Sequence, residues 1–339
     1  MVIPVKMEND SYNIYLERGA LNKVSEYIKV SDKKIMIVTD SGVPANYALT
    51  VKNQFDNAVI FTIPQGEENK NIDTFKMICQ KLLSEGFTRK DCVIAVGGGV
   101  TGDMAGFAAA CYMRGIDFYN IPTTLLSQID SSIGGKTAVN FCGVKNIVGA
   151  FYQPKRVLID PGLLKTLPKR QISNGLAEAV KMSLTSDGEL FSVFEGCDIE
   201  KSLDEIIIRS LNVKKSVVEK DEREAGLRKI LNFGHTVGHG IESCEKELYH
   251  GECVALGMIP MCSEAIRPRV VEVLKRCGLY REIEYDWDKI TKAAFHDKKA
   301  DGDTVTVTTV NEIGTFEMKK VNCLEVIKRA KNTLEGLVR

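Results

Sequence analysis

The sequence predicts an α/β, Rossmann-like N-terminal domain with a mostly parallel sheet, residues 1–168, followed by a mainly α-helical C-terminal domain, residues 169–339. Short apolar runs alternate with helical patterns in the first half, and helical periodicity dominates the second half. A glycine-rich turn, GGGVTGD, stands between an apolar run and a helical pattern. At 339 residues the chain is long enough for two hydrophobic cores.

Five apolar runs predict the parallel strands of the first domain. They span residues 34–39, 59–63, 92–96, 118–121 and 157–159. Strands that are apolar on both faces are typical of a parallel sheet covered by helices on each side. An amphipathic helix is expected at 72–85, and the β-rich runs 2–6 and 12–16 predict an antiparallel hairpin.

Helical patterns dominate the second domain. Apolar residues recur three to four positions apart in segments 172–182, 203–220, 229–244 and 255–277. Each of these segments is predicted to form a helix. A late pair of runs, 304–310 and 314–319, predicts a hairpin.

Charge is balanced over the whole chain, with 45 basic and 45 acidic residues. This balance argues against nucleic acid or an anionic membrane as a partner. No apolar run reaches the length of a membrane span, and the first residues lack the order of a signal peptide. The ten cysteines have no CxxC pair and no disulfide-like spacing, which is typical of reduced thiols in a cytoplasmic protein.

The glycine-rich turn is a candidate phosphate-binding element. Gly97, Gly99 and Gly102 satisfy the pattern GxGxxG, which lets a backbone approach a pyrophosphate at a helix N-terminus. The turn lies far from the N-terminus, and Asp117 only loosely supplies the acidic residue expected about twenty positions later. The pattern therefore predicts a phosphate-binding turn outside the ordinary Rossmann order, with a turn that binds no ligand as the alternative.

Segment 121–154 is rich in hydroxyl, amide, glycine and lysine residues and has little secondary-structure pattern. Within it, Lys136, Lys145 and Asn146 offer hydrogen-bond donors for a phosphate, and Asp130 offers a carboxylate for proton transfer. We expect a polar binding loop here, with an ordinary surface loop as the alternative.

Three of the four histidines fall within residues 231–252. His235 and His239 are four residues apart, which on a helix places both imidazoles on one face, where they can converge on one ion or substrate. His250 could fold back to join them. The alternatives are polar helix residues with ordinary hydrogen bonds, or a thiolate ligand from Cys244 or Cys253.

Eight segments together resemble the 3-dehydroquinate synthase family of sugar phosphate cyclases. They are PQGEENK (64–70), GGGVTGD (97–103), YMRG (112–115), PTTLLSQIDSSIGGKTAVN (122–140), GLAEAVK (175–181), DEREAGLRKILNFGHTVGH (221–239), HGE (250–252) and HDKK (296–299). Each is weak evidence alone, but in this order they cover nearly the whole chain.

The resemblance implies a bound NAD and a catalytic zinc or cobalt ion. The implied metal ligands are Glu178, His235 and His250, whereas His239 would contact the substrate and Lys181 would reach a substrate hydroxyl. This set differs from the His235 and His239 pair that spacing alone suggests. Because a glutamate is a normal third ligand of a catalytic zinc with an open position, we follow the family and expect the metal in the C-terminal domain.

The resemblance also implies the residues that bind NAD. They are Asp40, Glu67 and Lys70 on the adenosine side, Gly98, Gly99 and Asp103 at the pyrophosphate, Thr123 and Thr124 near the nicotinamide, and additionally Lys136 and Lys145. The N-terminal domain would therefore hold the cofactor, and a cleft is expected between it and the metal domain.

The implied substrate is a phosphorylated keto acid. Arg114, Lys136, Asn146 and Lys299 would bind its phosphate, Lys214, Arg228 and Asn232 its carboxylate, and Asp130 would serve in catalysis. The Arg114 equivalent reaches into a neighbouring subunit in the family, so a homodimer is expected. If one helix continues to His235, Arg228 would lie two turns before this ligand, along the same wall.

The implied reaction converts 3-deoxy-D-arabino-heptulosonate 7-phosphate to 3-dehydroquinate and phosphate in the shikimate pathway. NAD would take up a hydride and return it, with phosphate elimination between these steps and an intramolecular aldol closure at the end. Three alternatives remain: another sugar phosphate cyclase such as 2-deoxy-scyllo-inosose synthase, a metal-dependent polyol dehydrogenase, and a nucleotide-binding regulatory module without catalysis.

Overall fold

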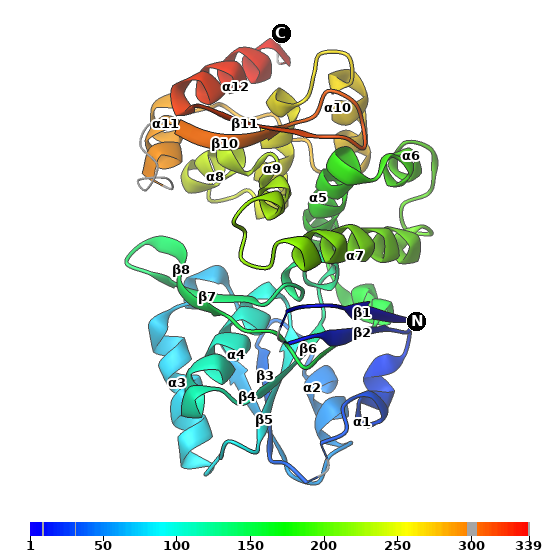
Figure 1. Cartoon of the computed structure of the whole chain (residues 1–339), viewed down its shortest axis with the longest axis vertical. Coiled ribbons are helices and arrows are strands. Elements are labelled where there is room, and N and C mark those ends of the chain that lie inside the picture. Colours follow the sequence, from blue (N-terminus) through cyan, green and yellow to red (C-terminus); the bar gives the residue numbers. More distant parts are fainter. Residues whose placement is uncertain (9, 31, 297–303, 338–339) are drawn as a thin grey trace. The chain divides into compact units, whose positions relative to one another are not determined.

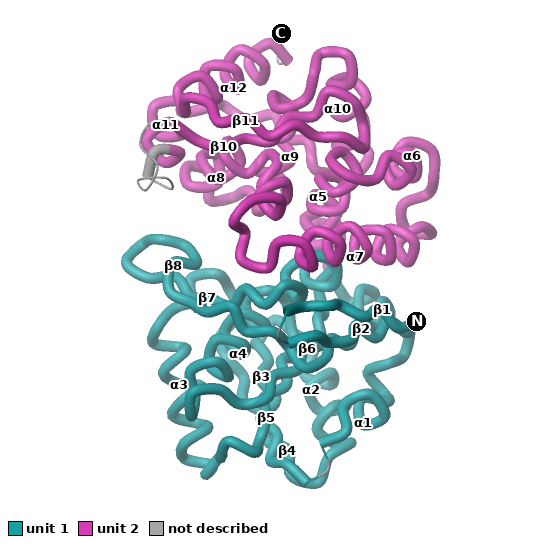
Figure 2. The backbone as a smooth tube through the Cα atoms, in the orientation of Figure 1, with its two compact units in different colours: residues 1–167 teal, residues 168–339 magenta. Residues whose placement is uncertain are grey.

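A computed structural model describes residues 1–8, 10–30, 32–296 and 304–337 of the chain. The chain divides into two compact units, Met1–Leu167 and Pro168–Arg339 (Figure 2). Unit 1 combines a mostly parallel sheet with helices, and unit 2 is mainly helical (Figure 1). The fold class predicted from the sequence is therefore confirmed.

Unit 1 is built on a seven-stranded sheet with the order β1-β2-β9-β6-β5-β3-β4. The strands are β1 Val2–Val5, β2 Tyr12–Leu16, β3 Ile35–Asp40, β4 Ala58–Ile63, β5 Cys92–Gly97, β6 Asp117–Pro122 and β9 Arg156–Ile159. β1 and β2 pair antiparallel, and every other neighbouring pair is parallel. The predicted hairpin and the five predicted parallel strands are confirmed.

Helices cover both faces of this sheet. They are α1 Val24–Tyr27, α2 Ala45–Lys52, α3 Ile72–Ser84 and α4 Gly99–Cys111. Along β3, Ile35 and Ile37 pack into one core with residues of α1 and α2, while Met36 and Val38 pack into a second core with residues of α3 and α4. Because successive side chains point to opposite faces, this central strand is apolar throughout.

Segment 121–154 contains more regular structure than the sequence pattern indicates. β7 Lys136–Phe141 and β8 Val144–Phe151 form an antiparallel hairpin outside the main sheet, and Ser127–Ser131 form a short π-helix. The expectation of a loop is therefore wrong for this part. Most of β8 is exposed, so it lacks the apolar alternation by which strands are recognised. Short 3-10 turns complete the unit at Ala20–Lys23, Glu67–Asn69, Tyr112–Arg114 and Pro161–Thr166.

Unit 2 consists of eight helices and one hairpin in its described part. The helices are α5 Lys169–Ser186, α6 Gly188–Gly196, α7 Leu203–Lys220, α8 His235–Cys244, α9 His250–Met258, α10 Arg267–Arg276, α11 Trp287–His296 and α12 Cys323–Leu337. β10 Thr304–Thr309 pairs antiparallel with β11 Glu317–Asn322. The predicted hairpin and the predicted helices at 172–182 and 203–220 are confirmed.

Two helices predicted as continuous are interrupted, and those predictions are wrong. The segment 229–244 divides into a 3-10 helix, Leu227–Asn232, and α8, because Gly234 adopts a left-handed conformation with φ 78°. The segment 255–277 divides into α9, a 3-10 turn Ile259–Met261, and α10, which has a proline in its first turn. His235 is consequently the first residue of a helix.

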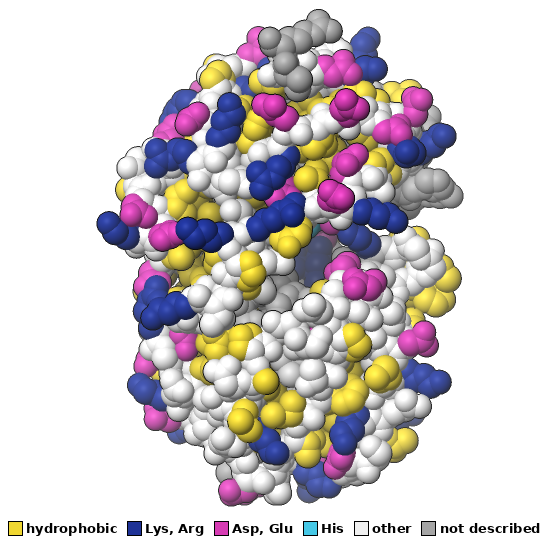
Figure 3. Space-filling model, turned by 180° about the vertical axis from the view of Figure 1, so that it is seen from behind, with side chains coloured by type: hydrophobic (Ala, Val, Ile, Leu, Met, Phe, Trp, Pro, Cys, Tyr) yellow, Lys and Arg dark blue, Asp and Glu magenta, His cyan; other side chains and the backbone are white. Residues whose placement is uncertain are grey.

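Charged side chains of both signs are interspersed over the face drawn in Figure 3, as the balanced composition predicts. Across the described residues, no helix combines the length and the apolar character needed to cross a membrane.

Candidate active site

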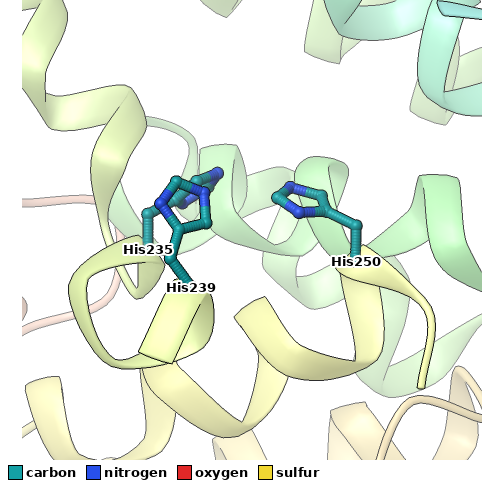
Figure 4. A group of neighbouring side chains, drawn as sticks. All are labelled: His235, His239 and His250. Atoms are coloured by element: carbon teal, nitrogen blue, oxygen red, sulfur yellow. The ribbon is translucent and has the colours of Figure 1, made fainter. Parts of the chain in front are cut away.

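Three histidines of unit 2 point toward one another (Figure 4). His235 begins α8, His239 lies one turn later, and His250 begins α9. Their ring centroids are separated by 5.2, 5.3 and 5.8 Å, and one nitrogen of each ring lies within 4.8 Å of one in the other two. The structure thus brings all three histidines of the predicted cluster together.

Glycines allow α8 and α9 to approach closely. A Cβ atom added to Gly257 of α9 would lie 2.1 Å from the carbonyl oxygen of Gly234, and one added to Gly238 of α8 would lie 2.9 Å from the Cα atom of Val254. Neither distance leaves room for a side chain. The separation of His235 and His250 therefore depends on backbone contact between their helices.

Glu178 of α5 completes the cluster. Its side chain is buried, and Oε1 lies 3.7 Å from His235 Nε2 and 3.6 Å from His250 Nε2. Within the described part of the chain, this oxygen has no hydrogen-bond partner, while Oε2 is ion-paired with the buried Lys181. Because buried carboxylate oxygens are normally satisfied, an unsatisfied one facing two imidazole nitrogens fits a divalent cation.

The outer nitrogens of two histidines are held by other groups. His235 Nδ1 lies 3.1 Å from the carbonyl oxygen of Phe233, and His250 Nδ1 lies 3.3 Å from Glu242 Oε2. Such contacts orient an imidazole ring so that its other nitrogen is available to a metal. Both Nε2 atoms are thereby directed at Glu178.

The charged groups of the cluster shift one another's pKa values. Burial would raise the pKa of Glu178, but Lys181 and the two histidines outweigh it and hold that pKa well below its usual range. Burial and the Lys181 charge lower the pKa of His235 to about 3. Burial also opposes protonation of His250, yet the nearby carboxylates of Glu178 and Glu242 raise that pKa to about 9. Glu178 is therefore an anion ready to accept a cation.

Glu252 anchors the start of α9. It is fully buried and accepts hydrogen bonds from Arg170 Nε at 2.9 Å, from Arg170 Nη2 at 2.8 Å and from the Tyr249 backbone at 2.8 Å. Arg281 Nη2 forms a further ion pair with it at 2.8 Å. Sequence reasoning assigned no role to these residues or to Glu242. The Tyr-x-x-Glu spacing at the helix start is the signal that could have found Glu252.

The remaining predicted residues of unit 2 that the structure describes lie on α7 and on the 3-10 helix Leu227–Asn232. Lys214 of α7 and Arg228 are buried. Arg228 donates to the carbonyl oxygen of Glu222, and Asn232 donates to Glu224 Oε1 at 2.6 Å. The placement of Arg228 two turns before His235 required one continuous helix, and that condition is not met, because the helix is interrupted at Gly234. Lys299 lies outside the described residues.

In unit 1, the residues predicted to bind NAD gather at the carboxyl ends of parallel strands. Asp40 ends β3, Glu67 follows β4, Gly98 follows β5, and Thr123 follows β6. The hydroxyl of Thr101 donates to Asp40 at 2.5 Å. In open α/β sheets, ligands bind beyond this edge.

Lys70 contacts both α4 and β8. It is ion-paired with Asp103 of α4 at 2.6 Å and donates to the side chain of Asn146. Burial would lower the pKa of Lys70, but Asp103 and Glu67 outweigh it and raise that pKa. Asn146, predicted to contact the substrate phosphate, therefore lies beside a residue predicted to bind NAD.

The N-terminus of α4 fits a phosphate group. Gly98 precedes the helix and offers no capping side chain, so the first backbone N–H groups have no side-chain acceptor. The buried hydroxyl of Ser131 has no hydrogen-bond partner within the described residues and lies 3.1 Å from the position of a Cβ on Gly99. Any residue larger than glycine would crowd this hydroxyl.

The other predicted residues of unit 1 lie at its surface, in the π-helix or just after β6. Arg114, Lys136 and Lys145 are exposed. Asp130 belongs to the π-helix, and Thr124 directly follows Thr123. Arg114 has a positive φ of 67°.

Comparison with known proteins resolves the family. The model of the 3-dehydroquinate synthase N-terminal region matches residues 60–174, and the model of its C-terminal region matches residues 175–300. The chain belongs to the 3-dehydroquinate synthase family. The resemblance inferred from its motifs is thereby confirmed.

Two relatives within the 3-dehydroquinate synthase family match almost end to end. A 3-dehydroquinate synthase of Streptococcus thermophilus is 40% identical, over 96% of this chain and 98% of its own length. That of Streptococcus suis is 38% identical, over 97% and 99%.

Solved structures of sister cyclases share the fold. A 2-deoxy-scyllo-inosose synthase complexed with carbaglucose-6-phosphate, NAD+ and Co2+ has a TM-score of 0.89 at 27% identity, covering 98% of this chain and 100% of the other. A 2-epi-5-epi-valiolone synthase of Streptomyces hygroscopicus with NAD+ and Zn2+ bound has a TM-score of 0.88 at 28% identity, covering 98% and 99%. A probable glycerol dehydrogenase of Sinorhizobium meliloti, 15% identical over 95% of this chain and 96% of its own, shares the fold alone, with a TM-score of 0.63.

Proposed function

We propose that this protein catalyses the 3-dehydroquinate synthase reaction as a phosphate-eliminating carbon–oxygen lyase of the shikimate pathway. Its substrate would be 3-deoxy-D-arabino-heptulosonate 7-phosphate. The observation that carries the proposal is 40% identity to a 3-dehydroquinate synthase over 96% of the chain, against 27% and 28% to the two sister cyclases.

Glu178, His235 and His250 would hold a zinc or cobalt ion, and the unsatisfied Oε1 of Glu178 between the two Nε2 atoms supports this choice. When bound, the ion would polarise substrate hydroxyl groups as a Lewis acid. His239 would contact the substrate. Lys181, beside Glu178, would donate to a substrate hydroxyl.

Unit 1 would be the NAD-binding domain, with the boundary near residue 168, and the residues from 169 onward would bind metal and substrate. When bound, NAD would accept a hydride from the substrate and return it later in the reaction. The ribose hydroxyl groups would bind Asp40, and the pyrophosphate would lie against Gly98 and Gly99. Glu67, Lys70, Asp103, Thr123, Thr124, Lys136 and Lys145 would complete this site.

Cationic side chains would bind the two acidic ends of the substrate. Arg114, Lys136, Asn146 and Lys299 are proposed for the phosphate, and Lys214, Arg228 and Asn232 for the carboxylate, with Asp130 in catalysis. Holding both ends fixes the reacting carbons, which lowers the barrier through positioning. We also propose a homodimer, with Arg114 serving the neighbouring subunit, and a cytoplasmic location.

The decisive experiment supplies 3-deoxy-D-arabino-heptulosonate 7-phosphate and follows phosphate release together with NADH absorbance. We expect one phosphate per substrate without net NADH, because the hydride returns to the product. Accumulating NADH would instead indicate a polyol dehydrogenase, and absence of both would contradict the proposal.

The second candidate is a sister cyclase, favoured by the TM-score of 0.89 to 2-deoxy-scyllo-inosose synthase. Replacing Arg228 with leucine separates the two candidates. A guanidinium can bind a carboxylate with two parallel hydrogen bonds, a contact that a sugar phosphate without a carboxylate cannot use. We expect Arg228→Leu to lower turnover of the keto acid phosphate at least about tenfold, roughly 1.4 kcal/mol.

The control for this variant is Arg223→Leu, an exposed arginine of the same segment. Because Arg228 is buried, the melting temperature and the metal and NAD contents of Arg228→Leu are measured alongside, and Arg228→Lys provides a milder change. Unchanged kinetics in Arg228→Leu would show that the carboxylate pocket lies elsewhere.

A further inference from the structure

A cavity of unit 2, apart from the residues proposed for metal, NAD and substrate, has a cationic wall. Its volume is about 440 Å³, and its lining comes from α12, from the start of α10 and from Glu264, three residues before α10. Arg267, Lys328 and Arg329 supply three positive charges to the lining.

Two guanidinium groups in this cavity share a single neutral acceptor. Arg267 Nη2 and Arg329 Nη2 each donate to the carbonyl oxygen of Cys262 at 3.2 Å. Within residues 1–8, 10–30, 32–296 and 304–337, neither arginine forms an ion pair, although Glu264 and Glu325 line the same cavity. Arg329 is exposed, so solvent screens part of the repulsion between the two cations, and an anion between them would offset the rest.

Arg267 also has an unused donor. Its Nε atom is buried and has no hydrogen-bond partner within the described residues. A buried donor without a partner is costly, and each such group in a folded protein calls for an explanation. Loss of hydration and the nearby Arg267 charge lower the pKa of Arg329, in agreement with this geometry.

We propose that this cavity binds a small organic anion, whose phosphate or carboxylate oxygens lie between Arg267 and Arg329. The planar guanidinium group suits both oxyanions because it donates parallel hydrogen bonds. The cavity is wide open to solvent and has room for a group larger than an oxyanion. Asn332, Thr333 and the two glutamates offer partners for hydroxyl or amino groups on the rest of the ligand.

The test measures thermal unfolding of the full chain with saturating metal and NAD, in phosphate, in succinate and in chloride at equal ionic strength. We expect phosphate or succinate to raise the melting temperature of the wild type relative to chloride. Arg329→Gln should lose at least half of that rise. In chloride alone, Arg329→Gln should melt no lower than the wild type, because it removes a repulsion.

Arg276→Gln is the matched control, since Arg276 lies on α10, is exposed and does not line the cavity. Arg276→Gln should keep the full rise in melting temperature, because it leaves the cavity intact. An anion bound elsewhere would stabilise all variants equally. Arg267→Gln provides a second variant of the site. The preferred group, phosphate or carboxylate, is the one whose rise in melting temperature differs more between the wild type and Arg329→Gln. Equal rises in wild type and both cavity variants, or no rise in the wild type, would overturn the proposal.

Discussion

Replacing His250 with alanine should remove most of the bound divalent metal and abolish nearly all turnover. Removing a group that hydrogen-bonds to a metal ligand lowers metal affinity or activity about 10–100-fold. Removing the ligand itself should therefore lower both at least about a hundredfold. A chelator should have the same effect on the unchanged protein, and added zinc or cobalt should reverse it. Metal content is measured by elemental analysis of the purified protein, beside steady-state kinetics.

His239→Ala is the matched comparison, because the three rings belong to the same cluster (Figure 4). If Glu178, His235 and His250 are the ligands, His239→Ala should keep its metal and still lose turnover. Loss of metal from His239→Ala and retention of metal in His250→Ala would reverse the assignment. Melting curves of both variants establish that each is folded.

Replacing Glu252 with alanine should destabilise unit 2 more than any change at its surface. The carboxylate is fully buried and faces two arginines whose side chains are 42% and 37% exposed. The substitution leaves no buried charge behind, because both arginines stay partly hydrated, so we expect the lost charged hydrogen bonds to cost about 1.5–3 kcal/mol. Urea denaturation of the metal-loaded protein measures the change in unfolding free energy.

A further effect of Glu252→Ala follows from the position of His250, two residues earlier on α9. Losing the bond to the Tyr249 backbone frees the start of the helix, so metal affinity should fall as well. Glu247→Gln is the control, because it keeps the carbonyl oxygen to which Arg170 donates and removes a carboxylate that forms no hydrogen bond with Arg170 in the described residues. If Glu252→Ala unfolded like Glu247→Gln, the arginine pairs would contribute nothing to stability.

The main sheet could be predicted because its strands are apolar on both faces. β3, with IMIVTD, shows this most clearly, since every residue before Asp40 is buried. β8 could not be predicted in the same way, because its side chains are mostly exposed. Without a buried face, the strand needs no regular series of apolar residues. The hairpin is held instead by backbone pairing between β7 and β8. This pairing leaves no periodic pattern of apolar residues in the sequence.

The helix breaks were missed for a different reason. Apolar spacing continues through Gly234, so periodicity alone cannot distinguish a break from a continuous helix. The His235 and His239 pair was visible from spacing, whereas Glu178 lies 57 residues before His235 on a different helix. A contact over that separation arises from packing, and only the resemblance indicated it.

The backbone contact between α8 and α9 has a consequence for how a metal enters the protein. Because main-chain atoms at Gly234 and Gly257 fix the distance between the helices, the imidazoles are brought together during folding rather than by the ion. The conformational entropy of assembling the ligands is therefore lost before binding. Unlike small zinc domains, which unfold without their metal, this site should empty and refill within an intact fold. Ions of similar radius should then exchange at a rate set by ligand dissociation, with no refolding step.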